Sequence, residues 1–150
     1  MNKGITLVEL MVAIGILMII FAIGMLMFGR MERDSEIDEI ASEIKATLQK
    51  SQALCLNNIP SGVYFETDKY TLFYGSSYNA NNPKNEIYNL PGTIRLTDIH
   101  LPSPPLTNSV TFDKITGYIT NYADPTNLTI RATSGRQKIM TLNKFGTIEI

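Results

Sequence analysis

Residues 1–30 read MNKGITLVELMVAIGILMIIFAIGMLMFGR, and this stretch decides the fold of the chain. No charged residue occurs between Leu10 and Phe28. An uncharged helix of about 19 residues, at about 1.5 Å of rise each, matches the thickness of a bilayer's hydrocarbon core. Glu9 is the one acid near the start of this run. A charge in hydrocarbon costs about 2.5–3.5 kcal/mol even on lenient insertion scales. We therefore expect Glu9 either to have a partner or to lie hydrated at the headgroup boundary.

A secretory signal peptide fits this stretch poorly, because Lys3 is the only basic residue before the apolar run and that run exceeds the usual ~7–15 residues. The string instead resembles the prepilin signature of type IV pilins and type II secretion pseudopilins. In that superfamily a membrane peptidase cleaves after a leader glycine and methylates the new N-terminus, and glutamate stands at the fifth mature position. Gly4 matches the leader glycine, Ile5 the methylated terminus and Glu9 the fifth-position acid. Ile5 departs from the phenylalanine that is common at that place.

The helix is predicted to continue beyond the apolar run. From Arg30 to about Asn57 the pattern becomes amphipathic, and Pro60 then ends it. The apolar stripe consists of Ile37, Ile40, Ala41, Ile44, Leu48 and Cys55. One helix from about Ile5 to Asn57 would be about 80 Å long, which suits a filament subunit. The alternative is an ordinary single-span anchor followed by a juxtamembrane helix.

The remainder of the chain is predicted to be β structure, because it consists of short segments in which apolar and polar residues alternate, separated by turn-forming residues. The expected strands are 62–65, 70–74, 86–90, 93–99, 110–112, 118–120, 127–132, 137–142 and 147–150. A proline-rich connection is expected from 100 to 109. The predicted fold is therefore α+β, a long N-terminal helix packed against an antiparallel β-sheet head. We expect residues 1–4 to be a leader, 5–29 a membrane and filament-core helix, 30–58 an amphipathic helix and 59–150 the globular head.

This layout resembles the H-type minor pseudopilins of type II secretion and the related minor pilins of type IV pili. Their heads share a Gly-Val-x-Phe strand, a Phe-x-x-x-x-Gly step and a terminal glycine turn. The matching ranges here are 62–65, 112–117 and 142–148.

The resemblance implies a structural subunit rather than an enzyme. Before assembly it would be a single-pass protein in the lipid of the inner membrane, with its head outside the cytoplasm. The prepilin peptidase would cut it, and an inner-membrane assembly platform would move it into a helical filament of other pilins or pseudopilins. Glu9 would then pair with the terminal amine of Ile5 in a neighbouring subunit. Whether the fibre serves secretion, motility or DNA uptake stays open at this point.

Composition gives little support to catalysis, metal binding or a cofactor. The chain has 13 basic and 14 acidic residues, so it is not built to coat nucleic acid or an acidic membrane. A single cysteine, Cys55, excludes an intrachain disulfide, and its place on the helix stripe favours a buried thiol. His100 is the only histidine, and no zinc, phosphate-loop or nucleophile motif accompanies it.

DNA binding by the head is the second functional hypothesis. The last 24 residues, from Asn127, hold four basic residues against one acid, Glu149. The candidate DNA contacts are Arg131, Arg136, Lys138 and Lys144. A charge run of this size is also what an ordinary solvated surface contains.

Overall fold

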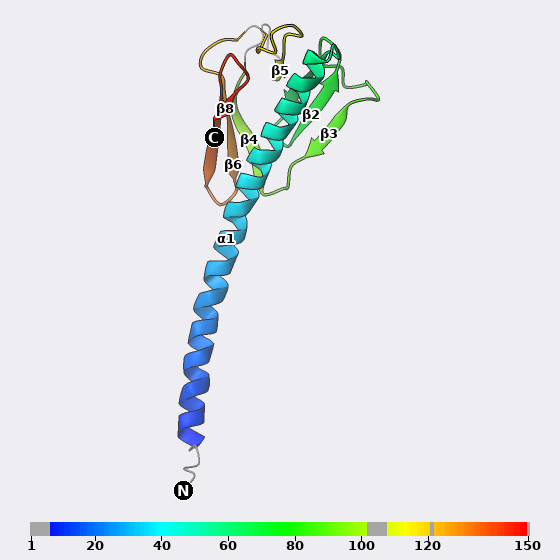
Figure 1. Ribbon diagram of the computed structural model, residues 1–150. Helices are drawn as coiled ribbons and strands as arrows, with labels where there is room; N and C mark the ends of the chain where they lie inside the picture. Colours follow the sequence, from blue (N-terminus) through cyan, green and yellow to red (C-terminus); the bar gives the residue numbers. More distant parts are fainter. Residues whose placement is uncertain (1–6, 102–107, 121, 150) are drawn as a thin grey trace. The chain divides into compact units, whose positions relative to one another are not determined.

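The computed structural model describes residues 7–101, 108–120 and 122–149, and the side chains of residues 26–35 lie outside this description. In the described part of the chain, helix α1 comes first and the strands follow it (Figure 1). The elements are α1 (Leu7–Leu56), β1 (Ser61–Phe65), β2 (Lys69–Tyr74), β3 (Glu86–Asn89), β4 (Ile94–His100), β5 (Ser109–Thr111), β6 (Asn127–Ala132), β7 (Gln137–Leu142) and β8 (Ile148–Glu149).

The chain divides into two compact units, Met1–Glu36 and Ile37–Ile150. The boundary falls within α1. The second unit, called the head below, therefore contains the C-terminal part of α1 together with all of these strands.

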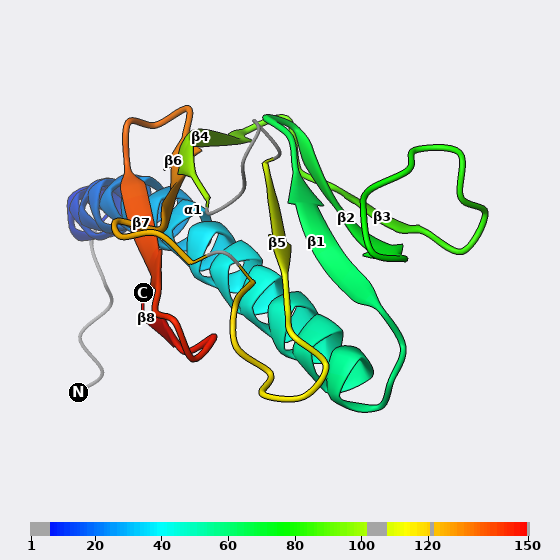
Figure 2. The same cartoon turned by 90° about the horizontal axis from the view of Figure 1, so that it is seen from above.

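Within the described residues, the strands of the head form two four-stranded antiparallel sheets. The strand order is β3-β2-β1-β5 in the first sheet and β4-β6-β7-β8 in the second. The predicted hairpin is present, with Val63 of β1 opposite Leu72 of β2. Figure 2 shows the C-terminal part of α1 running along both sheets. One helix thus serves as the shared cover for two sheets.

The core of the head lies between α1 and these sheets. All members of the predicted helix stripe are buried: Ile37, Ile40, Ala41, Ile44, Leu48 and Cys55. The same core contains Val63, Phe65 and Leu72 from the first sheet, and Leu96, Ile130 and Met140 from the second. The predicted α+β fold, with a helix stripe against antiparallel strands, is confirmed.

Close packing in the first sheet explains one glycine. A Cβ atom on Gly62 would lie 2.5 Å from Cζ of Phe73 and 2.7 Å from the carbonyl oxygen of Val110. The Phe73 ring therefore lies directly over the backbone of β1. Tyr78, from the β2–β3 connection, meets this ring edge to face and stacks on Tyr64 with the ring centroids of Tyr78 and Tyr64 4.0 Å apart. Aromatic side chains thus fix that connection to the sheet.

Two features of the head differ from the sequence prediction. The strands divide between two sheets, because alternation reports which face of a strand is covered but not which strands are neighbours. The predicted strand 118–120 contributes only the isolated bridge between Phe112 and Ile119, since the chain reverses at Gly117 with a φ of 69°. Residues 102–107 of the predicted connection and Ile150 lie outside the described residues.

Candidate assembly interface

The first unit presents an apolar helix surface. Within the described residues, one helix is long and apolar enough to cross a bilayer, namely the 19 residues Leu7–Met25 with a mean hydropathy of 2.7. None of this segment is buried. One shallow apolar groove along it is lined by Ile14, Leu17, Met18 and Phe21, which follow the i, i+3, i+4, i+7 spacing of one helix face. Apolar surface of this extent is stable only against lipid or other protein, so this helix is the candidate assembly surface.

Glu9 is the only charged residue in Leu7–Met25, and it lies in the first turn of α1. The positive end of the helix dipole favours an acid there by about 0.3–1 kcal/mol. This is a modest term beside the cost of taking a carboxylate into lipid. Gly4 and Ile5 lie outside the described residues, so the cleavage and methylation sites stay predictions.

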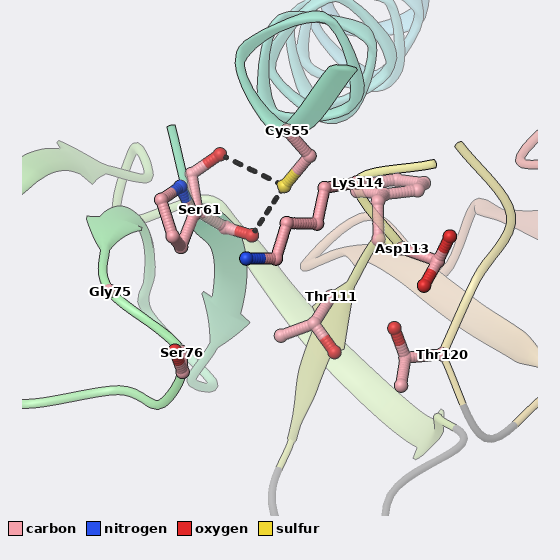
Figure 3. A pocket seen from close by; sticks show the side chains of 10 residues that line it. Cys55, Ser61, Gly75, Ser76, Thr111, Asp113, Lys114 and Thr120 are labelled. Carbon is pink, nitrogen blue, oxygen red and sulfur yellow. Dashed lines mark hydrogen bonds between the residues drawn. The ribbon is translucent and has the colours of Figure 1, made fainter. Parts of the chain in front are cut away.

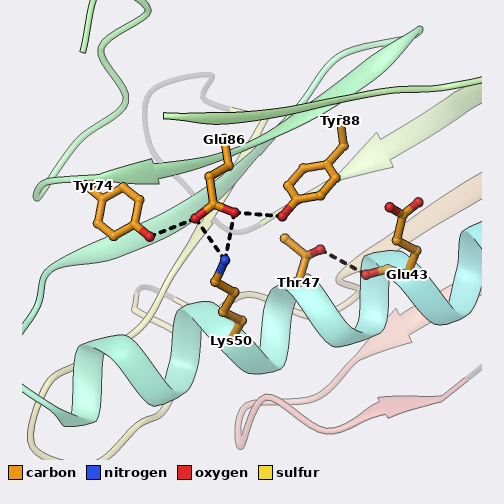
Figure 4. A network of polar contacts seen from close by, with 6 residues as sticks. All are labelled: Glu43, Thr47, Lys50, Tyr74, Glu86 and Tyr88. Carbon is orange, nitrogen blue, oxygen red and sulfur yellow. Dashed lines mark hydrogen bonds and ion pairs between the residues drawn. The ribbon is translucent and has the colours of Figure 1, made fainter. Parts of the chain in front are cut away.

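A charged hub joins α1 to the first sheet within the head, as Figure 4 shows. Lys50 of α1 donates to both carboxylate oxygens of Glu86 on β3, at 2.8 and 2.7 Å. The hydroxyls of Tyr74 and Tyr88 donate to one oxygen each, at 2.9 and 2.8 Å. One carboxylate thus receives hydrogen bonds from α1, β2 and β3 together.

Electrostatics keep this hub charged at neutral pH. The hydrogen bonds from Lys50 and then Tyr88 hold the pKa of Glu86 below its ordinary value, and the same ion pair raises the pKa of Lys50. Burial raises the pKa of Tyr74 and of Tyr88, so both hydroxyls remain donors. The Glu86 carboxylate is saturated by its own neighbours, and its role is to position the helix on the sheet.

The same helix face also meets the sheet through Thr47 and Tyr70. Thr47 donates its hydroxyl to the backbone carbonyl of Glu43 at 2.9 Å (Figure 4). Tyr70 of β2 is fully buried, and this burial raises the pKa of its hydroxyl. Aromatic stacking extends from Tyr70 to Tyr88, with the ring centroids 5.0 Å apart.

The four candidate DNA contacts are distributed over the second sheet. Lys138 stands opposite the buried Ile130 on β6 and forms an ion pair of 2.6 Å with Asp38, so it points toward α1. Successive side chains of a strand alternate between faces, so Arg131 points to the opposite face.

Arg131 donates to the side chain of Gln137 at 3.1 Å. Arg136 lies in the β6–β7 turn, while Lys144 lies beyond the far end of β7, with its Nζ 6.0 Å from the ring centroid of Tyr118. DNA binding stays a prediction, and these contacts give it no added support.

A pocket of about 230 Å³ lies beside the C-terminal end of α1 (Figure 3). Cys55, buried as predicted, donates its thiol to the carbonyl of Ser61 at 3.2 Å. The pocket is lined by Cys55, Pro60, Ser61, Gly75, Ser76, Thr111, Phe112, Asp113, Lys114 and Thr120. Among the described residues, no group of three or more His, Cys, Asp or Glu side chains could hold a metal ion.

Comparison with known families points to the N-terminal segment. Residues 1–27 match the family model described as the prokaryotic N-terminal methylation motif. The matched range includes Gly4, Ile5 and Glu9. The match supports the pilin and pseudopilin superfamily, with a single-pass membrane anchor, processing by a prepilin peptidase and assembly with other pilins. No curated protein and no solved structure matches the chain.

Sequence reasoning missed the hub around Glu86. Lys50 and Glu86 are 36 residues apart and share no local motif. The available signal was a lysine on the helix face next to the predicted stripe, together with Glu86 and Tyr88 on one face of a strand. That signal identifies which faces of the helix and the strand are polar, but not which of their side chains form hydrogen bonds with each other.

Proposed function

We propose that this chain is a minor pilin or pseudopilin, a structural subunit of a type IV pilus or type II secretion pseudopilus. Residues 1–4 are its leader, and the peptidase cleaves after Gly4 and methylates Ile5. Residues 5–29 anchor the precursor in the inner membrane and later form the filament core. Residues 30–58 carry the helix into the head, and the β-rich globular part of the head, residues 59–150, lies outside the cytoplasm.

The observation that carries this proposal is the wholly exposed apolar helix Leu7–Met25, joined to the matched N-terminal motif. A precursor satisfies this surface with lipid. In a filament, the equivalent helices of neighbouring subunits cover this surface. A subunit that leaves the lipid for the filament therefore exposes little apolar surface to water. The short head motifs shared with H-type minor pseudopilins support the minor-subunit assignment.

Glu9 is the residue proposed to set the register of assembly. Two opposite charges about 4 Å apart interact by roughly 1 kcal/mol in water and roughly 4 kcal/mol near a protein surface. Pairing of Glu9 with the terminal amine of Ile5 in a neighbour would satisfy both charges where water is scarce. A subunit placed one step out of register would lose this contact between Glu9 and the neighbouring amine in an apolar environment.

The test replaces the acid and measures assembly in cells with a working peptidase and platform. Glu9→Gln and Glu9→Ala subunits should still be cleaved after Gly4, yet their recovery in sheared filaments should fall about tenfold or more, as loss of the pair predicts. Glu149→Gln serves as the matched control, because Glu149 is an exposed acid on β8. If the Glu9 variants are processed and join the fibre as readily as this control, the proposed pairing is wrong.

A further inference from the structure

Three segments that are distant in sequence meet at the C-terminal end of α1. They are the last turn of α1, the turn after β5 and the β7–β8 turn. The turn after β5, coloured yellow, lies beside the end of α1 in both Figure 1 and Figure 2. Four of their apolar side chains are exposed: Leu56 at 53%, Ile115 at 87%, Tyr118 at 38% and Phe145 at 58%. These four residues are called the helix-end surface below.

One glutamine fixes this surface to α1. The Nε2 atom of Gln52 donates to the carbonyl of Gly117 at 2.7 Å and to that of Phe145 at 3.1 Å. Gly117 has a φ of 69°, and a Cβ atom on it would lie 3.2 Å from Cδ2 of Leu56. The rings of Tyr118 and Phe145 meet edge to face with their centroids 5.1 Å apart. The segments therefore hold one another in place.

Side-chain caps make the two turns rigid. Asp113 accepts hydrogen bonds from the amides of Ile115 and Thr116 at 2.9 Å, and from the Thr116 hydroxyl at 3.0 Å. The Asn143 side chain accepts from the amide of Phe145 at 3.0 Å. Ile115 and Phe145 thus project from capped turns. Clustered apolar side chains held rigidly in solvent mark an interaction site.

A cation lies beside the helix-end surface. The Nζ atom of Lys144 is 6.0 Å from the ring centroid of Tyr118, whereas Lys114 lines the neighbouring pocket beside Cys55 (Figure 3). The nearby acid Asp113 is occupied by the donors of its own turn, which hold its pKa below the usual value. A partner surface should therefore be shallow, partly apolar and acidic.

The head carries such a surface on α1 itself. Glu39, Ser42, Glu43 and Ala46 are all exposed and follow the i, i+3, i+4, i+7 spacing of one helix face. These four residues are called the acidic helix face below. Two small side chains leave it shallow between the carboxylates. Glu43 lies 13 residues before Leu56, or about 20 Å along the helix. One head therefore presents the two complementary surfaces at different levels of the same helix.

We propose that the helix-end surface of one copy docks on the acidic helix face of a second copy. The two patches are different, so the contact is heterologous and joins two copies head to tail. The inference rests on the proposed function and names a contact between two globular heads within the filament. Apolar burial of Ile115 and Phe145 supplies attraction, and Lys144 against Glu39 and Glu43 sets the register.

Disulfide trapping in assembled filaments tests the contact. Full-length Ile115→Cys and Ala46→Cys subunits, carrying different tags, are expressed together and oxidised. The expected product is a mixed dimer containing both tags. Native Cys55 is only 2% exposed and contributes no background. Ser134→Cys, in the exposed β6–β7 turn, replaces Ala46→Cys in the matched control and should give several-fold less mixed dimer.

Charge exchange gives a second readout on the same filaments. Lys144→Glu should lower the trapped dimer several-fold by placing like charges together, and adding Glu43→Lys to its partner should restore it. Restoration by the paired change cannot come from a folding defect in either variant alone.

The outcomes separate this inference from the proposed function. Trapping no stronger than in the Ser134→Cys control, or trapping of Ile115→Cys to a different protein, overturns the second-copy contact. If Glu9→Gln still blocks assembly in that case, the filament-subunit proposal stands without this contact. Failure of Lys144→Glu to lower trapping also overturns the charge-matched docking.

Discussion

Ile16 and Ile44 belong to the same helix, yet Ile16 is 54% exposed whereas Ile44 is fully buried. The difference is not in the residue type but in what lies beside it. Around Ile44 the apolar positions form a stripe that two sheets cover, whereas around Ile16 the helix is apolar on every side. A stripe can be satisfied within one chain. An all-apolar cylinder needs neighbours on all sides, which lipid or other subunits supply.

The largest contrast should come from truncating these two isoleucines. Ile44→Ala leaves a cavity under the sheets and should lower the free energy of unfolding of the head by about 2–5 kcal/mol. Ile16→Ala should change it by less than about 0.5 kcal/mol. Urea unfolding of the detergent-solubilised full chain, followed by tyrosine fluorescence, measures both. Equal losses in the two variants would mean that the halves of α1 do not differ as described.

Two glycines sharpen the same comparison. Gly62→Ala places a methyl group against Phe73 and the Val110 carbonyl, and should destabilise the head by about 1–3 kcal/mol. Gly15→Ala meets nothing within 4 Å and should leave the head unchanged. Thermal unfolding monitored by circular dichroism distinguishes them. A neutral Gly62→Ala would contradict the close packing of Phe73 on β1.

A change at Glu86 tests how much the contacts between α1 and the first sheet contribute to the stability of the head. Glu86→Gln removes the ion pair with Lys50 and weakens the tyrosine hydrogen bonds, so we expect a loss of about 1–2 kcal/mol. The exposed acid variant Glu149→Gln is the matched control and should be silent. Urea midpoints at neutral pH measure the difference. A Glu86→Gln head as stable as the control would show that the hub contributes nothing net.

The hub should also give the head an acid-dependent component of stability. The pKa of Glu86 is lowered on folding from its ordinary 4.5, so the unfolded chain takes up a proton first as the pH falls. The contribution is therefore complete above the unfolded pKa and is lost as the pH falls below 4.5 through the folded pKa. Urea midpoints between pH 7 and pH 3 should fall less steeply for Glu86→Gln than for the unaltered chain. Parallel curves would contradict this assignment.

The spacing of apolar residues along the chain was sufficient to predict the helix stripe and the first hairpin. The stripe from Ile37 to Cys55 is buried as expected, and the first hairpin has the expected strands. The division into two sheets and the hub between Lys50 and Glu86 depend on pairings between distant segments, which periodicity does not encode. Tyr118 illustrates the same limit. It was predicted to begin a strand over residues 118–120, whereas the capped turn at Asp113 and Gly117 decides its position.

The candidate site divides in the same way. Glu9 was predicted from its isolation in an apolar run, a signal that is entirely local. The helix-end surface was not predicted, since Leu56, Ile115 and Phe145 become neighbours only when three segments meet at Gln52. Local chemistry therefore indicated how the chain enters a membrane, and only the fold showed which part of the head could meet another copy.

The most direct test of the account is the intact mass of the subunit recovered from filaments sheared from cells with a working prepilin peptidase. The account predicts a chain that begins at Ile5, without Met1 through Gly4, and that carries one added methyl group. A chain in those filaments that still begins at Met1 would contradict it, because the charged terminus proposed to meet Glu9 of a neighbour would not exist.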